Sequence, residues 1–358
     1  MIAFSSRWRT LMTTLSMLMV FSAVVASPFS YVSAQDAQRP RLTVEESNRF
    51  GLSAPLPRPE GTVRVATYNV LNLIGPQADA SLAVHFSGGE FYTSHERALE
   101  LARTIREMDA DIIALQEVES YESLQWFRDN YLADMGYRYM ASFDVGYYRA
   151  IEQSVLSRFP ITNTRIWPNM SVRDVERPGL GWAPVPDDLD ELTYQRSPLM
   201  VEIQVNEDYS LTLFNVHHKA GGQASMYHRE AEAITLSGKV RQLMAAEPDR
   251  NIIVLGDFNA APWDKSLRTY LEIGLIDTQA HRNTRDEEGA LYKTHESNRV
   301  IDYILMNSAA HNELVIGSAH VFGRPAPPPQ YDWRRDPYPH GYASDHYPVI
   351  IDIVPADR

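Results

Sequence analysis

The chain has 358 residues, with 44% hydrophobic and 22% charged residues, which is typical of a soluble globular protein of one large or two ordinary domains. It contains no cysteine, so disulfides, thiolate catalysis and cysteine-ligated zinc are excluded. The formal charge of −13 argues against broad electrostatic capture of nucleic acid. It does not exclude a nuclease whose acids are concentrated at a metal site.

Residues 1–34 have the pattern of a secretory signal peptide. Two early arginines precede an apolar run over residues 11–26, and cleavage is expected after Ala34 or Ala26. The run is short for a membrane-spanning helix, which needs about 20 apolar residues, but an uncleaved anchor is the alternative. Because the segment holds two arginines and no acid, its removal changes the charge from −13 to −15. We therefore expect a secreted or periplasmic protein.

Residues 35–60 form a polar stretch with several prolines, which predicts a linker or an arm lying on the surface. Beyond it, no repeat or second low-complexity segment divides the chain. Residues 61–356 are therefore predicted to form one domain.

The predicted elements of this domain are mostly strands, with helices between them. Alternating or continuous apolar runs predict strands, and apolar residues spaced three or four apart predict helices. In chain order these are strand 62–69, helix 96–107, strand 111–117, helix 123–135, strands 153–156, 199–205 and 211–217, helix 228–246, strand 252–255, helix 266–272, and strands 300–305 and 348–353. Long crossovers mixed with hairpin-like neighbours favour an α/β fold with a mixed sheet or a pair of sheets faced by helices.

Two irregular segments, residues 165–196 and 324–343, are rich in proline, and the second is also dense in tyrosine and tryptophan. Long irregular segments in a compact domain are usually functional or mobile. The aromatic side chains of residues 324–343 could stack on a substrate ring or line an apolar groove. A proline-stiffened surface loop is the alternative. The position directly before Ser344-Asp345-His346 favours substrate contact.

Polar residues follow the apolar strands at several of their ends. Gly256-Asp257-Phe258-Asn259 directly follows the run 252–255. Its glycine lets the backbone turn sharply or come close to a ligand, and Asp and Asn supply oxygen ligands or hydrogen bonds. Taken alone, simple capping explains this motif equally well. The other ends are Tyr68-Asn69, Gln116-Glu117, Asn215-Val216-His217, Asp302 and Asp345-His346. Six such ends are improbable as turns alone.

These residue types suit metal-assisted attack of water on a phosphoester. A hard divalent ion prefers carboxylates, so Glu117 and Asp345 are candidate ligands. Asn69 and Asn259 can donate hydrogen bonds to phosphate oxygens without adding negative charge. Asp257 can accept a hydrogen bond from the attacking water.

The series of motifs resembles the endonuclease/exonuclease/phosphatase superfamily, which includes deoxyribonuclease I, exonuclease III, bacterial sphingomyelinases and inositol polyphosphate 5-phosphatases. The matching stretches run in the family's order: Ala66-Thr-Tyr-Asn69-Val, Ile113-Ala-Leu-Gln-Glu117-Val, Val155-Leu-Ser-Arg-Phe-Pro-Ile161, Leu213-Phe-Asn-Val-His217, Leu255-Gly-Asp257-Phe-Asn259-Ala, Arg299-Val-Ile-Asp302-Tyr-Ile-Leu and Ser344-Asp345-His346-Tyr-Pro-Val. Each is weak alone, but together they are specific and cover about residues 61–356. The resemblance implies a four-layered α/β sandwich, two packed mixed β-sheets flanked by helices, with the active site at one sheet edge.

The resemblance also implies a metal site. Glu117 would be the main ligand, with Asn69 and Asp345 contributing, and the cofactor would be Mg²⁺, with Mn²⁺ or Ca²⁺ as alternatives. Asp257 and Asn259 would orient water and phosphate.

Two histidines would complete the machinery, since histidine carries protons near neutral pH. His346, paired with Asp302, would act as a general base or as a transition-state stabiliser. His217 would stabilise the phosphoryl oxygen or protonate the leaving group. His218 is the alternative to His217. Strand alternation sends the two side chains to opposite faces, and the family pattern favours His217.

Other polar residues have weaker support. Lys219 and Arg229 could contact the substrate phosphate or could be solvated surface residues. His295 and His340 are interpreted as loop histidines and not as ligands.

The substrate is predicted less sharply than the chemistry. The motif style resembles exported bacterial members often described as nucleases, so DNA is favoured, although the charge of −15 opposes it. The alternative is a phosphatase or a sphingomyelinase-like phospholipase C acting on a small or lipid phosphoester, with aromatics of residues 324–343 at a membrane interface. A non-catalytic module is disfavoured because every expected residue is present. We expect a monomer without an obligate protein partner.

Overall fold

The computed structural model describes residues 40–86, 91–186, 192–280, 285, 289 and 292–357, so the predicted signal peptide lies outside the described residues. The fold is that of the compact unit Pro40–Arg358. Within the described ranges, no helix combines the length and the apolar character that a bilayer span requires.

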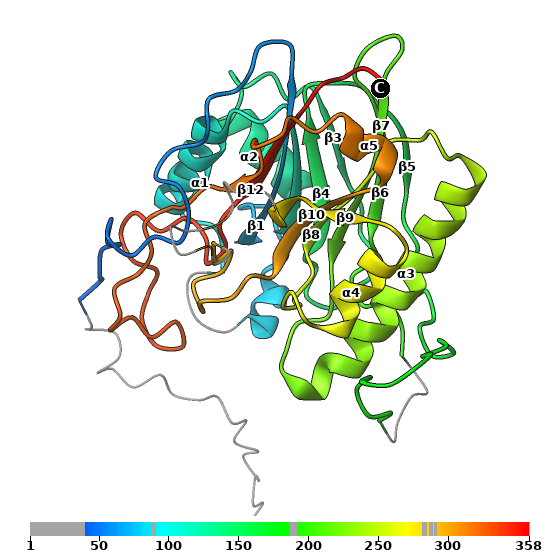
Figure 1. Ribbon diagram of the computed structural model, residues 1–358. Helices are drawn as coiled ribbons and strands as arrows, with labels where there is room; N and C mark the ends of the chain where they lie inside the picture. The colour runs from blue at the N-terminus through cyan, green and yellow to red at the C-terminus, as the bar shows by residue number, and fades with distance from the viewer. Residues whose placement is uncertain are drawn as a thin grey trace, which may run out of the picture. The chain divides into compact units, whose positions relative to one another are not determined.

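Two six-stranded mixed sheets form the centre of this unit (Figure 1). The first has the spatial order β11 (His320–Val321), β12 (Val349–Ile353), β1 (Val63–Leu73), β2 (Ile112–Val118), β4 (Glu152–Ser157) and β3 (Tyr139–Ser142). The second has the order β5 (Ile161–Arg165), β6 (Leu199–Gln204), β7 (Ser210–His217), β8 (Ile252–Asp257), β10 (Asp302–Met306) and β9 (Ile276–Asp277). The pairs β1–β2 and β7–β8 are parallel, and the other neighbours are antiparallel.

Helices cover the outer faces of both sheets (Figure 1). α1 (His95–Met108) and α2 (Tyr121–Tyr131) pack on the first sheet, and α3 (Met226–Ala246) and α4 (Lys265–Glu272) pack on the second. Serine side chains cap α1 and α2, where Ser94 accepts from Arg97 N and Ser120 from Ser123 N. The remaining helical pieces are α5 (Ser308–Asn312) and short 3-10 turns at Ala80–His85, Gln223–Ser225 and Thr278–Ala280.

Three buried apolar clusters separate the layers. One lies between the sheets, one between the first sheet and α1 and α2, and one between the second sheet and α3 and α4. Alternation along a strand decides which cluster each residue joins. In β7, Leu213 faces the other sheet and Phe214 faces the helices. The predicted four-layered α/β sandwich is therefore confirmed.

Each predicted strand and helix is present with shifted ends. The sequence patterns missed β3, β5, β9, β11 and α5. The strands β9 and β11 have only two residues each, too few to show a period, and β5 is a largely exposed edge strand of polar residues.

The described part of the predicted arm lies against the segment that follows β11. Isolated bridges join Thr43 to His340, Glu45 to Ala326 and Leu52 to Phe322. Residues 42–52 therefore support the proline-rich and aromatic loop 324–343. The boundary between arm and domain at residue 60 stays a prediction.

Candidate active site

The second sheet supplies three of the predicted residues from neighbouring strands. His217 pairs with Asp257 across β7 and β8, and Asp257 pairs with Asp302 across β8 and β10. Each continues the alternate positions of its strand that face the first sheet: Leu213 in β7, Leu255 in β8 and Ile304 in β10. The three side chains therefore gather at one edge of the space between the sheets. The His217 Nε2 atom lies 3.4 Å from Asp257 Oδ2.

Gly256 allows β7 and β8 to approach at this edge. Its φ is +140°, and an added Cβ would lie 2.0 Å from the Val216 carbonyl oxygen. No other residue fits there without displacing backbone. Three residues later, Asn259 adopts a left-handed φ of 48°, and its amide Nδ2 donates to Asp257 Oδ2 at 3.0 Å. The Gly-Asp-x-Asn motif thus turns the chain and orients the Asp257 carboxylate.

The first sheet supplies Asn69 and Glu117 at irregularities of the β1–β2 and β2–β4 ladders. Glu117 has a left-handed φ of 67°, a costly backbone conformation for this residue type that directs its side chain into the site. Asn69 Nδ2 lies 3.3 Å from both Glu117 Oε1 and Asp257 Oδ2, so its amide links the two sheets. The backbone N–H of Asn72 donates to Glu117 Oε2 at 3.1 Å.

The turn before β12 places Asp345 and His346 against these groups. Ser344 Oγ donates to the Asn69 carbonyl at 2.7 Å, which ties the turn to β1. His346 Nδ1 lies 2.9 Å from Asp302 Oδ2, as predicted for the pair. Its Nε2 lies 3.8 Å from Asp257 Oδ2 and 4.0 Å from Asp345 Oδ1. A cavity of about 350 Å³ is lined by Glu117, His217, Asp257, Asn259, Asp345 and His346.

Burial and neighbouring charge separate the protonation states of these groups. Burial lowers the pKa of His217 well below its ordinary value, and the nearby Arg196 adds to this effect, so its ring is neutral. Burial also lowers the pKa of His346, but the carboxylates of Asp302 and Asp257 outweigh it, and the net pKa is well above the ordinary value. Burial raises the pKa of Asp257 to about 7.

Asp345 is held in its charged form. Burial raises its pKa, but the positive charge of His346 and the hydrogen bond from His295 lower it further, and the net pKa is below the ordinary value. Asp345 and Glu117 therefore offer hard oxygen donors to one cavity, and their donor chemistry fits a divalent cation. A cation held there would polarise a phosphoryl oxygen and stabilise charge on the leaving oxygen.

His218 faces away from this cavity, on the helix side of the second sheet. Its Nδ1 lies 3.0 Å from Tyr194 Oη and its Nε2 lies 2.9 Å from Tyr270 Oη. The ring is fully buried and packs edge-on to Phe258. Both ring nitrogens are engaged in the core, so His217 is the one of the two histidines that lies in the site.

Lys219 and Arg229 lie beside the site and not in it. Arg229 is buried and donates to the carbonyls of Lys219 at 2.9 Å and Gly221 at 3.1 Å, so it supports the loop that borders the cavity. Among the described residues that line the two cavities, neither Lys219 nor Arg229 is present. Their contact with a substrate phosphate stays a prediction.

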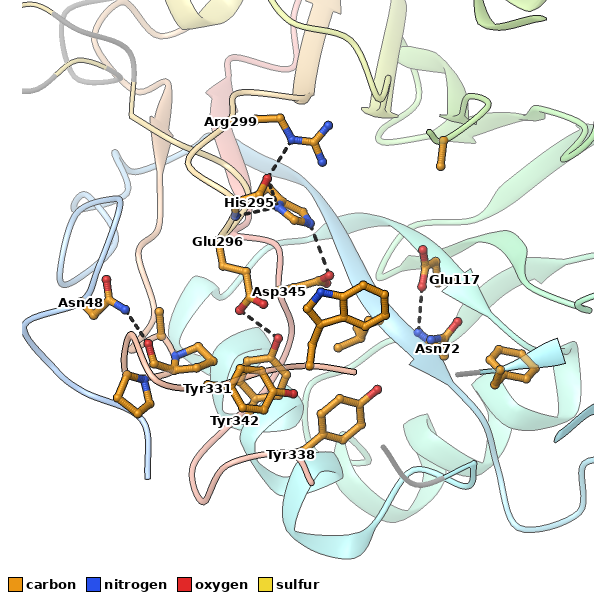
Figure 2. Close-up of a pocket in the computed structure, with 18 of the residues that line it drawn as sticks. Asn48, Asn72, Glu117, His295, Glu296, Arg299, Tyr331, Tyr338, Tyr342 and Asp345 are labelled. Carbon is orange, nitrogen blue, oxygen red and sulfur yellow. Dashed lines mark hydrogen bonds and ion pairs between the residues drawn. The ribbon is translucent and has the colours of Figure 1, made fainter. Parts of the chain in front are cut away.

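His295, interpreted from sequence as a loop histidine, lies against the predicted metal ligand. Its Nε2 is 3.3 Å from Asp345 Oδ2, and its ring packs edge-on to that of His346 at 4.6 Å. Ser297 N–H donates to His295 Nδ1 at 2.9 Å, so the proton of the neutral ring sits on Nε2 and points at Asp345. Arg299 Nε donates in turn to Ser297 Oγ at 2.7 Å. Figure 2 shows His295 between Arg299 and Asp345.

No local pattern could have identified His295. It lies in an irregular segment, and it reaches the site only because an isolated bridge pairs it with His346. Its donated hydrogen bond orients one Asp345 oxygen, as partners of metal-ligating carboxylates commonly do.

A larger cavity of about 750 Å³ adjoins the first (Figure 2). Both cavities are lined by Glu117, His295 and Asp345, so these residues stand at their junction. Half of the other residues that line the larger cavity are aromatic or proline: Phe86, Phe91, Pro327, Pro328, Pro329, Tyr331, Trp333, Tyr338 and Tyr342.

The model of the Endonuclease/Exonuclease/phosphatase family matches residues 66–346. The chain belongs to this family. Two groups of side chains could hold a metal ion: the buried Asp257, Asp302 and His346, and the partly buried His295 and Asp345 with His346. Together with these groups, membership identifies a phosphoesterase with a divalent-metal site. A search of curated proteins found no match.

Solved structures of the family share its fold with this chain. The human Nocturnin catalytic domain with bound sulfate anion is 16% identical, with a TM-score of 0.53, over 86% of this chain and 97% of its own. A family protein from Beutenbergia cavernae is 18% identical (TM-score 0.52; 82% of this chain, 72% of its own). One from Bacteroides vulgatus is 16% identical (TM-score 0.50; 82% and 98%). At these identities, the likeness shows the four-layered fold alone.

Proposed function

We propose that the protein is an exported, Mg²⁺-dependent phosphodiesterase that hydrolyses DNA by activated water. The observation that carries the phosphoester chemistry is the meeting of Asp257, Asp302 and His346 from separate strands and turns. Asp257 and His346 line one small cavity together with Glu117 and Asp345, and Asp302 holds the Nδ1 side of His346.

Each of these residues has a role that its environment favours. Asp257, with a pKa of about 7, is suited to accept the proton of the attacking water near neutral pH. His346, kept protonated by its carboxylate neighbours, is suited to donate from Nε2 to a phosphoryl oxygen, the stabilising one of its two predicted roles. His217 is neutral, and its Nε2 lies 3.4 Å from Asp257 Oδ2. From there its ring can help Asp257 to orient the oxygen of the attacking water.

Plasmid nicking tests the nuclease activity. The chain from residue 35 onward should convert supercoiled plasmid to nicked circles with Mg²⁺ or Mn²⁺, and a chelator should abolish the reaction. Asp302→Asn should lose most of this activity because it weakens the support of His346. Absence of cleavage with every divalent ion tested would reject DNA as the substrate.

A small or lipid phosphoester is the second candidate. The charge of −15 after removal of residues 1–34 opposes binding of a long polyanion, and the larger cavity has the size of a small-ligand site. Release of phosphocholine from sphingomyelin, or of inorganic phosphate from monoesters, at rates above DNA cleavage would favour this candidate.

Export and a monomeric state belong to the same proposal. The N-terminal sequence of the protein recovered outside the cytoplasm should begin after Ala34 or Ala26. Light scattering should then give the mass of one chain.

A further inference from the structure

The larger cavity adjoins the predicted metal site and is walled by the proline and aromatic side chains of residues 324–343. We propose that this cavity binds an unstacked nucleobase beside the scissile phosphate, so that the enzyme prefers single-stranded or frayed nucleic acid to paired duplex. The inference rests on the proposed phosphoesterase function and names its substrate class.

One wall of the cavity is a cluster of aromatic rings. Trp333 is 49% exposed and lines the cavity, and the Arg334 guanidinium lies 4.5 Å from the centre of its indole. Tyr338 stacks on Tyr342 at 5.4 Å, and Tyr331 packs against Tyr342 at 6.1 Å. Flat aromatic surfaces of this kind are platforms on which bases stack, because every base has a π face.

Arg149 contributes a positive charge to another part of the cavity lining. The Arg149 guanidinium lies 4.8 Å from the centre of the Phe86 ring, and its Nη2 donates to Asn72 Oδ1 at 3.2 Å. Asn72 N–H holds the Glu117 carboxylate, so this pair is coupled directly to the predicted metal site. A phosphate at that site would therefore have a positive charge and aromatic surface beside it.

Polar groups in the lining favour a ring with a polar edge over an acyl chain. The Glu296 carboxyl accepts from Tyr342 Oη at 3.0 Å, and Asn48 and Arg299 also line the cavity. An acyl chain would cover these groups without offering hydrogen bonds, which is unfavourable. A nucleobase offers both faces for stacking and donors and acceptors at its rim.

The cavity wall is held in place by the arm. Glu45 N–H donates to the Ala326 carbonyl at 2.8 Å, and His340 N–H donates to the Leu42 carbonyl at 2.7 Å, so both ends of the loop are anchored. Within the loop, Asp336 N–H donates to the Asp332 carbonyl at 2.8 Å. A wall ordered before binding reduces the entropy lost when the ligand binds.

The cavity can hold a single nucleotide, but a base stacked inside a duplex cannot reach it. Its volume of about 750 Å³ lies within the range of small-ligand pockets, roughly 300–1,000 Å³, and can hold a nucleotide. A base inside a duplex has both faces covered by its neighbours, so it reaches such a pocket only after it unstacks. Affinity gained from stacking also depends less on phosphate contacts, which suits an acidic protein.

Binding of a nucleotide and of its base-free analogue tests the cavity apart from turnover. In a His346→Ala background with Mg²⁺ present, calorimetry should show AMP binding about tenfold more tightly than ribose 5-phosphate, the gain expected from one stacked base. Adding Trp333→Ala should bring the two affinities to within about twofold, and Trp333→Phe should retain most of the difference. Trp263→Ala, which removes an exposed indole outside both cavities, should change neither affinity. Equal affinities in the parent, or a difference that survives Trp333→Ala, would overturn the proposal.

Cleavage assays are the second test of the proposal. A single-stranded oligonucleotide should have a KM about tenfold below that of the same oligonucleotide built with abasic residues, and Trp333→Ala should remove this difference with little change in kcat. The paired duplex should be the poorer substrate, and equal KM values for duplex and single strand would reject the inference. If no phosphoester is hydrolysed with any divalent ion, the proposed function fails. The comparison of AMP with ribose 5-phosphate still decides whether the cavity binds a base.

Discussion

The two cavities of the site are built in different ways. The small acidic cavity takes its lining from strand ends and the turns next to them, where the register of the ladders aligns His217, Asp257 and Asp302. The larger cavity takes its walls from loops, which are held by isolated bridges and by the arm. In the proposed function, the residues that carry the chemistry therefore lie on the most constrained part of the fold. The residues proposed to select the substrate lie on loops, which can vary without disturbing the sheets.

The neighbours His217 and His218 show how strongly the ladder determines the acidic cavity. They differ by one position, yet one faces the catalytic edge and the other is buried among tyrosines. Strand alternation alone separates them. In the loops no such rule exists, and His295 reaches Asp345 only through a tertiary contact.

The largest effect is expected from His346→Ala, which removes a group of the acidic cavity. Turnover should fall by about 10²–10⁴-fold, as is usual when a positioned acid or base is lost. Steady-state hydrolysis of the active phosphoester measures it, with thermal unfolding to show that the variant is folded. An unchanged kcat would mean that the strand ends do not carry the chemistry.

Glu117→Gln should come next, because it removes the carboxylate charge while keeping the size of the side chain. We expect Mn²⁺ affinity, measured by calorimetry, to fall by at least about tenfold. Glu122→Gln, on the exposed first turn of α2, is the matched control and should bind Mn²⁺ normally. Equal affinities in the two variants would remove Glu117 from the metal site.

His295→Ala tests the contact between the two regions. Without its hydrogen bond, the Asp345 carboxylate loses its orientation, and Mn²⁺ should bind about tenfold more weakly. His340→Ala is the matched control, since His340 also pairs with a carboxylate, that of Glu96, outside the cavities. His295→Gln, which keeps a donor, should recover part of the affinity. If His295→Ala and His340→Ala behave alike, the loop does not position the ligand.

The smallest effect on turnover is expected from Glu152→Gln, because Glu152 is a buried residue of β4 that lines neither cavity. Burial raises the pKa of Glu152 to about 8. The unfolded chain releases this proton at lower pH, so the stability of the folded protein falls as pH rises from about 4.5 towards 8. Glu152→Gln should flatten this decline and raise the free energy of unfolding at pH 8.5 by an order of a few kcal/mol. Urea unfolding at pH 6 and 8.5 measures it, and an unaltered slope would contradict the assignment.

The sequence by itself indicated the layered α/β fold and the strand-end residues that meet at the acidic cavity. Period-two alternation places each strand residue on one face, and polar residues after apolar runs mark the strand ends. Only the tertiary structure decided the rest: that His295 orients Asp345, that Arg229 supports a loop, and that residues 42–52 hold the aromatic wall. These contacts join segments far apart in the chain that have no regular period. No local pattern in the sequence specifies which of these segments meet. The packing of the whole domain brings them together.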